Sequence, residues 1–185
     1  NFFKHPGVDA KGVIRAFKNN VFNLLNDKRL EGASTITQQV AKNFLLTNEV
    51  SIKRKIKEAI LAFRIERAYS KERIMELYLN QIYLGEGTYG IAAASLEYFD
   101  KAVSELSYEE AAMLAALPKA PSKYNPYKSK KIAKTRRDFV LRNLYENSYI
   151  NESEYKNLIN KEIKIKKRKI ELLEEANFYT EEVRR

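Results

Sequence analysis

The sequence lacks cysteine altogether and contains a single histidine, His5. Without cysteine the chain can form neither a disulfide framework nor a thiolate metal site, and one histidine excludes a multi-histidine metal centre. No apolar run approaches the roughly 20 residues that a membrane-spanning helix needs. The chain also opens at Asn1 with neither a methionine nor the features of a signal peptide, so we expect a piece of a longer protein.

Among the charged residues of the chain, basic side chains outnumber acidic ones. The 185 residues include 34 lysines and arginines against 24 aspartates and glutamates, a formal net charge of +10. This balance suits a polyanionic partner, an anionic membrane surface or a phosphorylated substrate, and charge alone does not choose among them. Because 44% of the residues are hydrophobic, the chain can bury the core of about one globular domain.

Helical spacing of apolar residues recurs along most of the chain and indicates a compact all-α lobe with a basic C-terminal appendage. We expect helices over residues 10–27, 51–69, 71–81, 91–99, 108–117, 130–146 and 152–160. Only residues 162–170 alternate between polar and apolar side chains as a half-buried strand does. The glycine-rich turn at residues 85–90 lacks the preceding strand and the Lys-Ser/Thr pair of a nucleotide-binding loop, so we reject a nucleotide site there.

The helix expected over residues 51–69 places charge between two apolar strips. When residues are placed around a helix at about 100° each, the two apolar strips predict that other parts of the protein enclose most of the helix circumference. The wider strip consists of Ile52, Ile56, Ala59, Ile60 and Phe63. Between the strips lies what we call the charged sector, formed by Arg54, Lys55, Glu58, Ala62 and Glu66. Such a sector is either a buried ion-pair network or a functional site.

Two further stretches each allow two interpretations. Residues 10–27 combine apolar side chains with flanking lysines, which suits a helix in a membrane interface or a helix packed on the core. Their apolar residues are Val13, Ile14, Phe17, Val21, Phe22, Leu24 and Leu25. In residues 32–43, Ser34, Gln38 and Lys42 recur at four-residue intervals from a helix start. This row can hold an anion such as phosphate, or form an ordinary solvated helix face.

Motif by motif, residues 1–126 resemble the peptidoglycan glycosyltransferase domain of class A penicillin-binding proteins, glycosyltransferase family 51. The end of the first family motif is present as Phe2, His5 and Gly7. The second motif spans residues 32–43, and the third is the charged sector itself. The fourth motif comprises Lys71, Ile74, Glu76, Tyr78, Leu79, Asn80, Tyr83 and Gly85, and a fifth stretch runs over residues 97–126.

The resemblance implies a lysozyme-like helical lobe with a smaller membrane-associated lobe. It also implies polymerisation of lipid II into β-1,4-linked glycan chains, with inversion and release of undecaprenyl pyrophosphate. This reaction needs a base for the acceptor hydroxyl and cations for the leaving group. The family's general base, the first-motif glutamate, falls just upstream of Asn1, so we expect the printed chain to bind the pyrophosphate without polymerising lipid II.

The resemblance also assigns roles to residues of this chain. Glu58 matches the second essential carboxylate, which either orients the phosphate-binding cations or holds a divalent metal ion (Mg or Mn); no other cofactor is implied. The pyrophosphate-binding residues are Ser34, Thr35, Gln38, Gln39, Lys42, Arg54 and Lys55. Supporting roles fall to His5, Glu66, Glu76 and Asn80, and we expect His5 to support the loop that carries the base.

By the same resemblance, residues 1–160 form the glycosyltransferase domain, with a membrane-interface segment at about 10–30. Residues 161–185 form a linker toward a transpeptidase domain. The expected partners are lipid II, the nascent glycan, phosphoglycolipid inhibitors and the outer face of the bacterial cytoplasmic membrane, with no nucleic acid. Two positions depart from the family pattern. Val50 stands where many members have an arginine that contacts phosphate, and Lys53 could supply that contact instead. Asp100 stands where the pattern has glycine.

Two other classes of protein remain as alternatives. A lysozyme-like lytic transglycosylase or muramidase would share the helical lobe and a catalytic glutamate, but it would not need a cationic cluster for a pyrophosphate. A basic helical nucleic-acid-binding module would explain the net charge, but it would concentrate basic residues on an exposed surface. It gives no reason for Glu58 and Glu66 inside the charged sector.

Overall fold

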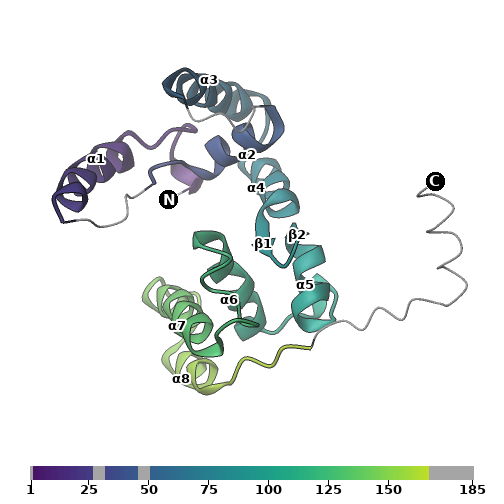
Figure 1. The fold of residues 1–185 in the computed structure, drawn as a ribbon. Coiled ribbons are helices and arrows are strands. Elements are labelled where there is room, and N and C mark those ends of the chain that lie inside the picture. Colours follow the sequence, from purple (N-terminus) through teal and green to yellow (C-terminus); the bar gives the residue numbers. More distant parts are fainter. Residues whose placement is uncertain (1, 27–31, 46–50, 167–185) are drawn as a thin grey trace, which may run out of the picture. The chain divides into compact units, whose positions relative to one another are not determined.

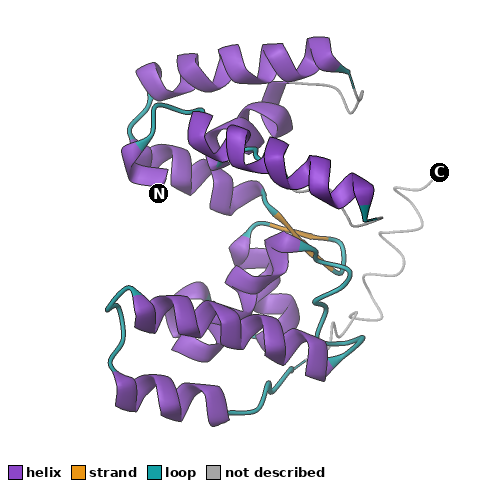
Figure 2. Ribbon diagram, turned by 90° about the vertical axis from the view of Figure 1, so that its left-hand side faces the viewer, coloured by secondary structure: helices purple, strands orange, loops and turns teal. Residues whose placement is uncertain are grey.

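The structure is a computed structural model of the chain, and it describes residues 2–26, 32–45 and 51–166. These residues form eight α-helices, three short 3-10 helices and one two-stranded hairpin (Figures 1 and 2), which confirms the expected all-α class. The chain divides into two compact units, Asn1–Ile82 and Tyr83–Arg185, which we call unit 1 and unit 2.

Unit 1 is built from helices whose starts are fixed by polar caps. Its elements are η1 (Phe2–Lys4), α1 (Ala10–Leu25), α2 (Ile36–Leu45), α3 (Ile52–Ala68) and α4 (Lys71–Gln81). Asp9 caps α1, Ser51 caps α3 and Ser70 caps α4, each by accepting a hydrogen bond from a first-turn amide. α2 packs against both α3 and α4, so it sets the positions of the two helices that carry the third and fourth motifs.

The inward side of α3 is its charged sector and not its apolar strip. Its buried residues are Glu58 and Ala62. Ile52, by contrast, is 83% exposed, and Ile56, Ile60 and Phe63 are also exposed. The expectation that the helix is enclosed on most of its circumference is therefore wrong. Neighbours cover α3 on the side of Ala62, where Gly7 approaches so closely that a Cβ atom would lie 3.1 Å from the Ala62 carbonyl oxygen.

α1 also turns its apolar residues outward. Gly12 and Ala16 are the buried residues of this helix, while Phe17 is 70%, Phe22 59% and Leu25 81% exposed. The alternative in which these side chains pack on the core is therefore wrong, and the membrane interface stays a prediction. Residues 27–30 of the predicted interface segment lie outside the described residues. No helix in the described part of the chain is long and apolar enough to cross a membrane.

Unit 2 begins with a hairpin and continues as a helical bundle. Its elements are β1 (Tyr83–Gly85), β2 (Thr88–Tyr89), α5 (Ile91–Phe99), η2 (Val103–Glu105), α6 (Tyr108–Ala116), η3 (Leu117–Lys119), α7 (Lys130–Glu146) and α8 (Glu152–Asn160). Tyr83 pairs with Tyr89 in the hairpin. The core joins α6, α7 and α8 through Ala112, Leu141, Ile150 and Leu158. α8 has the expected capping box, in which Asn151 and Glu154 each bind the other's backbone amide at 2.8–2.9 Å.

The end of α5 explains why the family pattern has glycine at position 100. Asp100 has a φ of 54°, in the left-handed region that glycine adopts most easily. Its carboxylate lies 2.8 Å from Lys166 Nζ, and the Lys166 amide donates to the Tyr98 carbonyl at 3.0 Å. The turn after α5 therefore forms with aspartate in place of glycine. Through Lys166, the segment after α8 is bound to this turn.

The strand expected over residues 162–170 is not formed at residues 162–166, and residues 167–170 lie outside the described part. Ile163 is buried while its neighbours are exposed, so the alternating pattern reflects contact of one side of an extended segment with unit 2. This segment forms no backbone ladder with another described strand. The linker expected over residues 161–185 stays a prediction, since the structure describes this segment only to residue 166.

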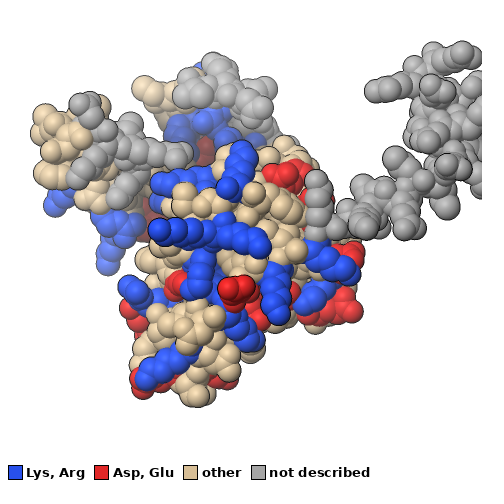
Figure 3. Space-filling model, turned by 60° about the horizontal axis from the view of Figure 1, so that its bottom comes forward, with Lys and Arg blue, Asp and Glu red and all other residues tan. Residues whose placement is uncertain are grey.

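Basic and acidic side chains are mixed on the face shown in Figure 3, where lysine and arginine predominate and aspartate and glutamate lie among them. Several of the basic side chains of unit 2 are paired: Lys134 lies 2.6 Å from Asp138, and Lys101 lies 2.7 Å from Glu110. On this face the interspersed arrangement differs from the concentrated basic surface that a nucleic-acid-binding module would need.

Candidate active site in unit 1

Glu58 is the buried charge at the centre of the charged sector, with a side chain only 1% exposed. Its Oε2 accepts from Arg54 Nη1 at 3.2 Å and its Oε1 accepts from Lys55 Nζ. Spacings of four and three residues place these cations on the same side of α3 as the carboxylate. The two cations compensate the cost of burying the carboxylate, and removal of either would leave a poorly paired buried charge.

The start of α2 lies beside this ion-pair network. Lys55 Nζ also donates to Ser34 Oγ at 2.7 Å, which joins the second and third motifs in space. The Lys55 side chain is 49% exposed, so its ammonium is open to solvent while Glu58 and Ser34 hold it. The structure thus brings together Ser34, Arg54, Lys55 and Glu58, four of the predicted site residues; their role as a site stays a prediction.

Thr35 and Gln38 have structural contacts of their own. The Thr35 amide donates to Gln38 Oε1 at 3.0 Å, and the Gln38 amide donates to Thr35 Oγ1 at 3.2 Å, which makes a reciprocal cap at the start of α2. Thr35 Oγ1 also donates to the Gly7 carbonyl at 2.6 Å. Both side chains are buried. This cap uses the side-chain oxygen of Gln38 and not its amide nitrogen.

Lys42 and Arg54 provide donors that no neighbour uses. Lys42 is exposed in the last turn of α2, and its side chain makes no ion pair or hydrogen bond with another described residue. Arg54 Nε is buried and has no hydrogen-bond partner in the described part of the chain. Gln39, also in the second motif, is half-buried. An unpartnered buried donor and an exposed ammonium each suit an anionic ligand.

A second network holds the segment from Phe2 to Gly7. Glu66 Oε1 accepts from Thr37 Oγ1 at 2.5 Å and from Lys71 Nζ at 2.7 Å. The same ammonium donates to the His5 carbonyl at 2.7 Å and lies 4.5 Å from the centre of the Phe2 ring. The sequence did not single out Thr37, although it belongs to the same run of hydroxyl residues as Ser34 and Thr35.

His5 stabilises this segment through its ring as well. The Gly7 amide donates to His5 Nδ1 at 3.2 Å, so the neutral imidazole carries its proton on Nε2. Burial, and next to it the charge of Lys71, lower the pKa of His5 from its ordinary value of 6.5. The ring is therefore neutral at pH 7. These contacts agree with a supporting role for His5, which stays a prediction.

Glu76 and Asn80 stand apart from both networks. Both are exposed on α4, and Glu76 is paired with Arg73 at 2.6 Å. Neither contributes a hydrogen bond to the charged sector among the described residues. The structure therefore offers no contact through which they would support the site.

A divalent metal ion does not fit the residues around Glu58. Both carboxylate oxygens already bind cationic side chains, which would repel a metal ion. Among the described residues there is also no group of three or more histidine, aspartate or glutamate side chains that could hold one. We therefore derive no step through a metal.

Comparison with known proteins defines the class of protein. Residues 1–145 match the transglycosylase family, and the chain belongs to that family. Its relatives include penicillin-binding protein 1A of Rickettsia prowazekii, 51% identical over 184 residues, and that of Aquifex aeolicus, 51% identical over 167 residues. These alignments cover 100% and 90% of this chain, and 23% of each relative.

A solved structure supports the same assignment. The crystal structure of penicillin-binding protein 1A from Haemophilus influenzae aligns with 81% of this chain and 19% of its own, with a TM-score of 0.52 and 33% identity. The chain thus spans about a quarter of the length of the curated relatives that it matches.

Proposed function

We propose that this chain belongs to the glycosyltransferase domain of a peptidoglycan glycosyltransferase that polymerises lipid II into β-1,4-linked glycan with inversion and releases undecaprenyl pyrophosphate. Membership of the transglycosylase family and the similarity to penicillin-binding proteins 1A support the class of reaction. The observation that carries the proposal is the buried Glu58 held between Arg54 and Lys55, with Ser34 bound to the same ammonium.

In the proposed reaction these groups stabilise the leaving pyrophosphate. Negative charge grows on its oxygens as the glycosidic bond breaks, and preorganised cations stabilise that charge most in a partly desolvated site. Arg54 Nε and the exposed ammonium groups of Lys42 and Lys55 supply the donors, and Ser34 supplies a neutral one. Charge-assisted hydrogen bonds to phosphate oxygens are roughly twice as strong as neutral ones.

Glu58 acts in this proposal as a positioning residue. Because each of its oxygens already accepts from a cation, it holds Arg54 and Lys55 in place and is badly placed to take the proton of the acceptor hydroxyl. We assign that proton to the first-motif glutamate, which the family resemblance places before Asn1. The segment from Phe2 to Gly7, tied to Lys71 and Thr35, would position that glutamate.

We also propose that unit 1 lies on the outer surface of the cytoplasmic membrane. α1 exposes Phe17, Phe22 and Leu25, and exposed basic side chains of the same helix suit anionic lipid headgroups. These basic residues are Lys11, Arg15 and Lys18. A lipid-linked substrate would then meet the site at the membrane surface. The remaining length of the longer protein would carry the transpeptidase domain.

The test replaces Glu58 with glutamine in a chain extended upstream by the Glu-Asp pair of the first motif. We expect polymerisation of lipid II, followed as glycan chains on gels, to fall by about 10²–10³-fold, because the cations lose their anionic support. Glu72→Gln, an exposed carboxylate on α4, is the matched control and should keep full activity. If Glu58→Gln polymerises at the wild-type rate with an unchanged melting temperature, Glu58 is structural and the proposal fails.

A further inference from the structure

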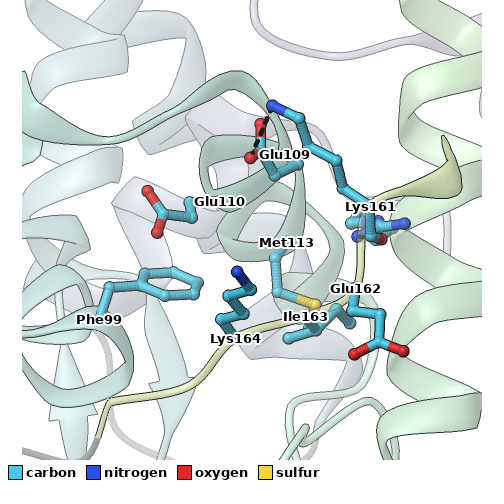
Figure 4. Close-up of a pocket in the computed structure, with 9 residues that line it drawn as sticks. Phe99, Glu109, Glu110, Met113, Lys161, Glu162, Ile163 and Lys164 are labelled. Atoms are coloured by element: carbon cyan, nitrogen blue, oxygen red, sulfur yellow. Dashed lines mark hydrogen bonds and ion pairs between the residues drawn. The ribbon is translucent and has the colours of Figure 1, made fainter. Parts of the chain in front are cut away.

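The segment after α8, residues 161–166, is fastened to unit 2 at both ends. At its start Lys161 Nζ lies 3.0 Å from Glu109 Oε1, a contact drawn as a dashed line in Figure 4. At its end the Lys166 amide donates to the Tyr98 carbonyl at 3.0 Å. The last described residue of the chain is therefore held at a fixed point beside α5.

The turn that precedes α7 lies next to this point. Tyr127 stacks on Tyr98 with the ring centres 5.4 Å apart, and the Tyr127 hydroxyl donates to the Glu97 carbonyl at 2.8 Å. Lys128 follows directly and is exposed. One pair of stacked rings thus connects the anchored end of the segment with the start of α7.

One side of α7 exposes apolar residues beside a cation. Ile132, Arg136 and Phe139 follow one another at spacings of four and three residues, which places them on the same side of the helix. Ile132 is 43% and Phe139 47% exposed. We call these three residues, together with Lys123 and Lys128 of the preceding loop, the basic face of unit 2. Exposed apolar side chains that lie together favour contact with another segment.

Two aromatic rings hold the Arg136 guanidinium in this face. Its Cζ lies 4.6 Å from the ring centre of Phe139 and 5.6 Å from that of Tyr124, and Lys123 Nζ lies 5.8 Å from the same Tyr124 centre. The Arg136 Nε is buried without a partner in the described part of the chain, whereas both Nη nitrogens, also without a partner there, keep contact with solvent. A guanidinium fixed in this way can bind a carboxylate through two parallel hydrogen bonds.

The cations around the basic face outnumber the acids that could neutralise them. Between Glu110 and Asp138 the sequence contains eight lysines and arginines and no aspartate or glutamate. Lys134 and Arg137 pair with Asp138, and the other six make no ion pair with a described residue. An acidic partner would neutralise this surface.

The chain itself contains a segment of the complementary composition. Between Lys169 and Arg184 the sequence has five glutamates and no lysine or arginine. This acidic segment, residues 171–182, lies outside the described residues, and it begins five residues after Lys166, a length that an extended chain covers over at most about 18 Å. It also offers apolar side chains, namely Leu172, Leu173, Ala176, Phe178 and Tyr179.

We propose that residues 171–182 dock on the basic face of unit 2, with glutamates on its cations and apolar side chains on Ile132 and Phe139. The short connection to Lys166 favours this segment over a separate acidic peptide, because tethering raises its effective concentration at the face. Docking would fix the direction in which the chain continues beyond unit 2. The inference stands independently of the proposed glycosyl transfer.

The absence of cysteine allows a single spin label to be placed in the acidic segment. The ¹⁵N-labelled 185-residue chain carries a nitroxide at Asn177→Cys, and its amide signals are compared with those after reduction of the nitroxide. We expect stronger loss of signal at the Arg136 and Phe139 amides than at the Lys156 amide of α8. At about 1 M salt, where the Debye length is about 3 Å, the two signals should recover, because the contact depends on charge.

Two changes test the contact from its two sides. Arg136→Gln should abolish the selective loss of signal at Phe139, and so should replacement of all five glutamates of the acidic segment with glutamine. Lys156→Gln removes a lysine that is 67% exposed on α8, and this matched control should keep the selective loss. The glutamate variant changes no described residue, so it keeps the test decisive if Arg136→Gln does not fold.

A mixed sample separates docking within one chain from docking between two. In it, spin-labelled chain without ¹⁵N is added to ¹⁵N-labelled chain without a spin label, and we expect no selective loss at Arg136 and Phe139. A loss as large as that within one chain would make a second copy the occupant and would overturn the proposal. Equal loss at the Arg136, Phe139 and Lys156 amides, no loss at all, or a loss that the glutamate variant retains would overturn it too.

Discussion

Lys55 Nζ donates to Ser34 Oγ at 2.7 Å, and this contact joins the start of α2 to the charged sector of α3. The same ammonium binds the buried carboxylate of Glu58. A hydroxyl, an ammonium and a carboxylate thus form one chain of contacts, with the half-exposed ammonium of Lys55 in the middle. Such a chain fixes the position of the ammonium before a ligand arrives, which reduces the entropy lost on binding.

Gly7 should be required for the packing of the N-terminal segment on α3. It has a φ of +89°, and a Cβ atom there would lie 2.9 Å from Glu66 Cγ and 3.1 Å from the Ala62 carbonyl oxygen. We expect Gly7→Ala to lower the free energy of unfolding by about 1–3 kcal/mol, measured by denaturant titration. Gly32→Ala, where the Cβ atom would meet nothing within 4 Å, is the control and should be nearly neutral. Equal effects of the two changes would contradict the close packing of Gly7.

The N-terminal segment should loosen in acid through His5. The pKa of His5 is lower in the folded chain than its ordinary value of 6.5, so the unfolded chain binds a proton first as the pH falls. The contribution of His5 to stability is therefore present above pH 6.5 and is lost as the pH falls through the folded pKa. Protonation also removes the Nδ1 acceptor that the Gly7 amide uses.

Hydrogen exchange can follow this loss at a single amide. The protection factor of the Gly7 amide should fall between pH 7 and pH 5. That of the Gly12 amide, bound to Asp9 Oδ1 at 2.9 Å, should hold, because this same hydrogen bond lowers the pKa of Asp9. Parallel loss of protection at both amides would mean general unfolding and would refute a local role for His5.

The apolar side of α1 should bind lipid without being needed for folding. Phe17, Phe22 and Leu25 are all more than half exposed, so replacing the three with serine removes little buried apolar area. We expect the variant to keep its melting temperature and to be released from anionic vesicles in sedimentation assays. Tyr149→Ser, at an exposed aromatic residue of unit 2, should leave vesicle binding unchanged. Unfolding of the triple variant would show that α1 packs within the protein.

Local signals in the sequence were sufficient for most helix boundaries. The expected helices at residues 71–81, 91–99, 130–146 and 152–160 coincide with α4, α5, α7 and α8. Ser70 and Asn151 cap two of them through hydrogen bonds within four residues, so the information is local. What could not be predicted depends on contacts between distant residues, such as the ion pair of Asp100 with Lys166.

The inward side of α3 shows why amphipathic pattern was a poor guide in unit 1. A helical wheel assumes that the apolar side faces the core, but here α3 buries Glu58 and exposes Ile52. Paired cations make this burial tolerable, and the motif spacing of Arg54, Lys55 and Glu58 did predict their contact. The reciprocal cap formed by Gln38 was missed because the same polar side chain suits both a cap and a ligand.

The most direct test of the account is the affinity of the 185-residue chain for a phosphoglycolipid, measured by calorimetry at fixed salt. If Lys42 and Arg54 face the pyrophosphate, Lys42→Ala and Arg54→Ala should each weaken binding by about 1.5–3 kcal/mol, the value of a hydrogen bond to a charged group. Lys57→Ala removes an exposed lysine of α3 outside the charged sector and controls for the change in net charge. Unchanged affinity in both Lys42→Ala and Arg54→Ala, or an equal loss in Lys57→Ala, would contradict the assignment of this cluster to the leaving group.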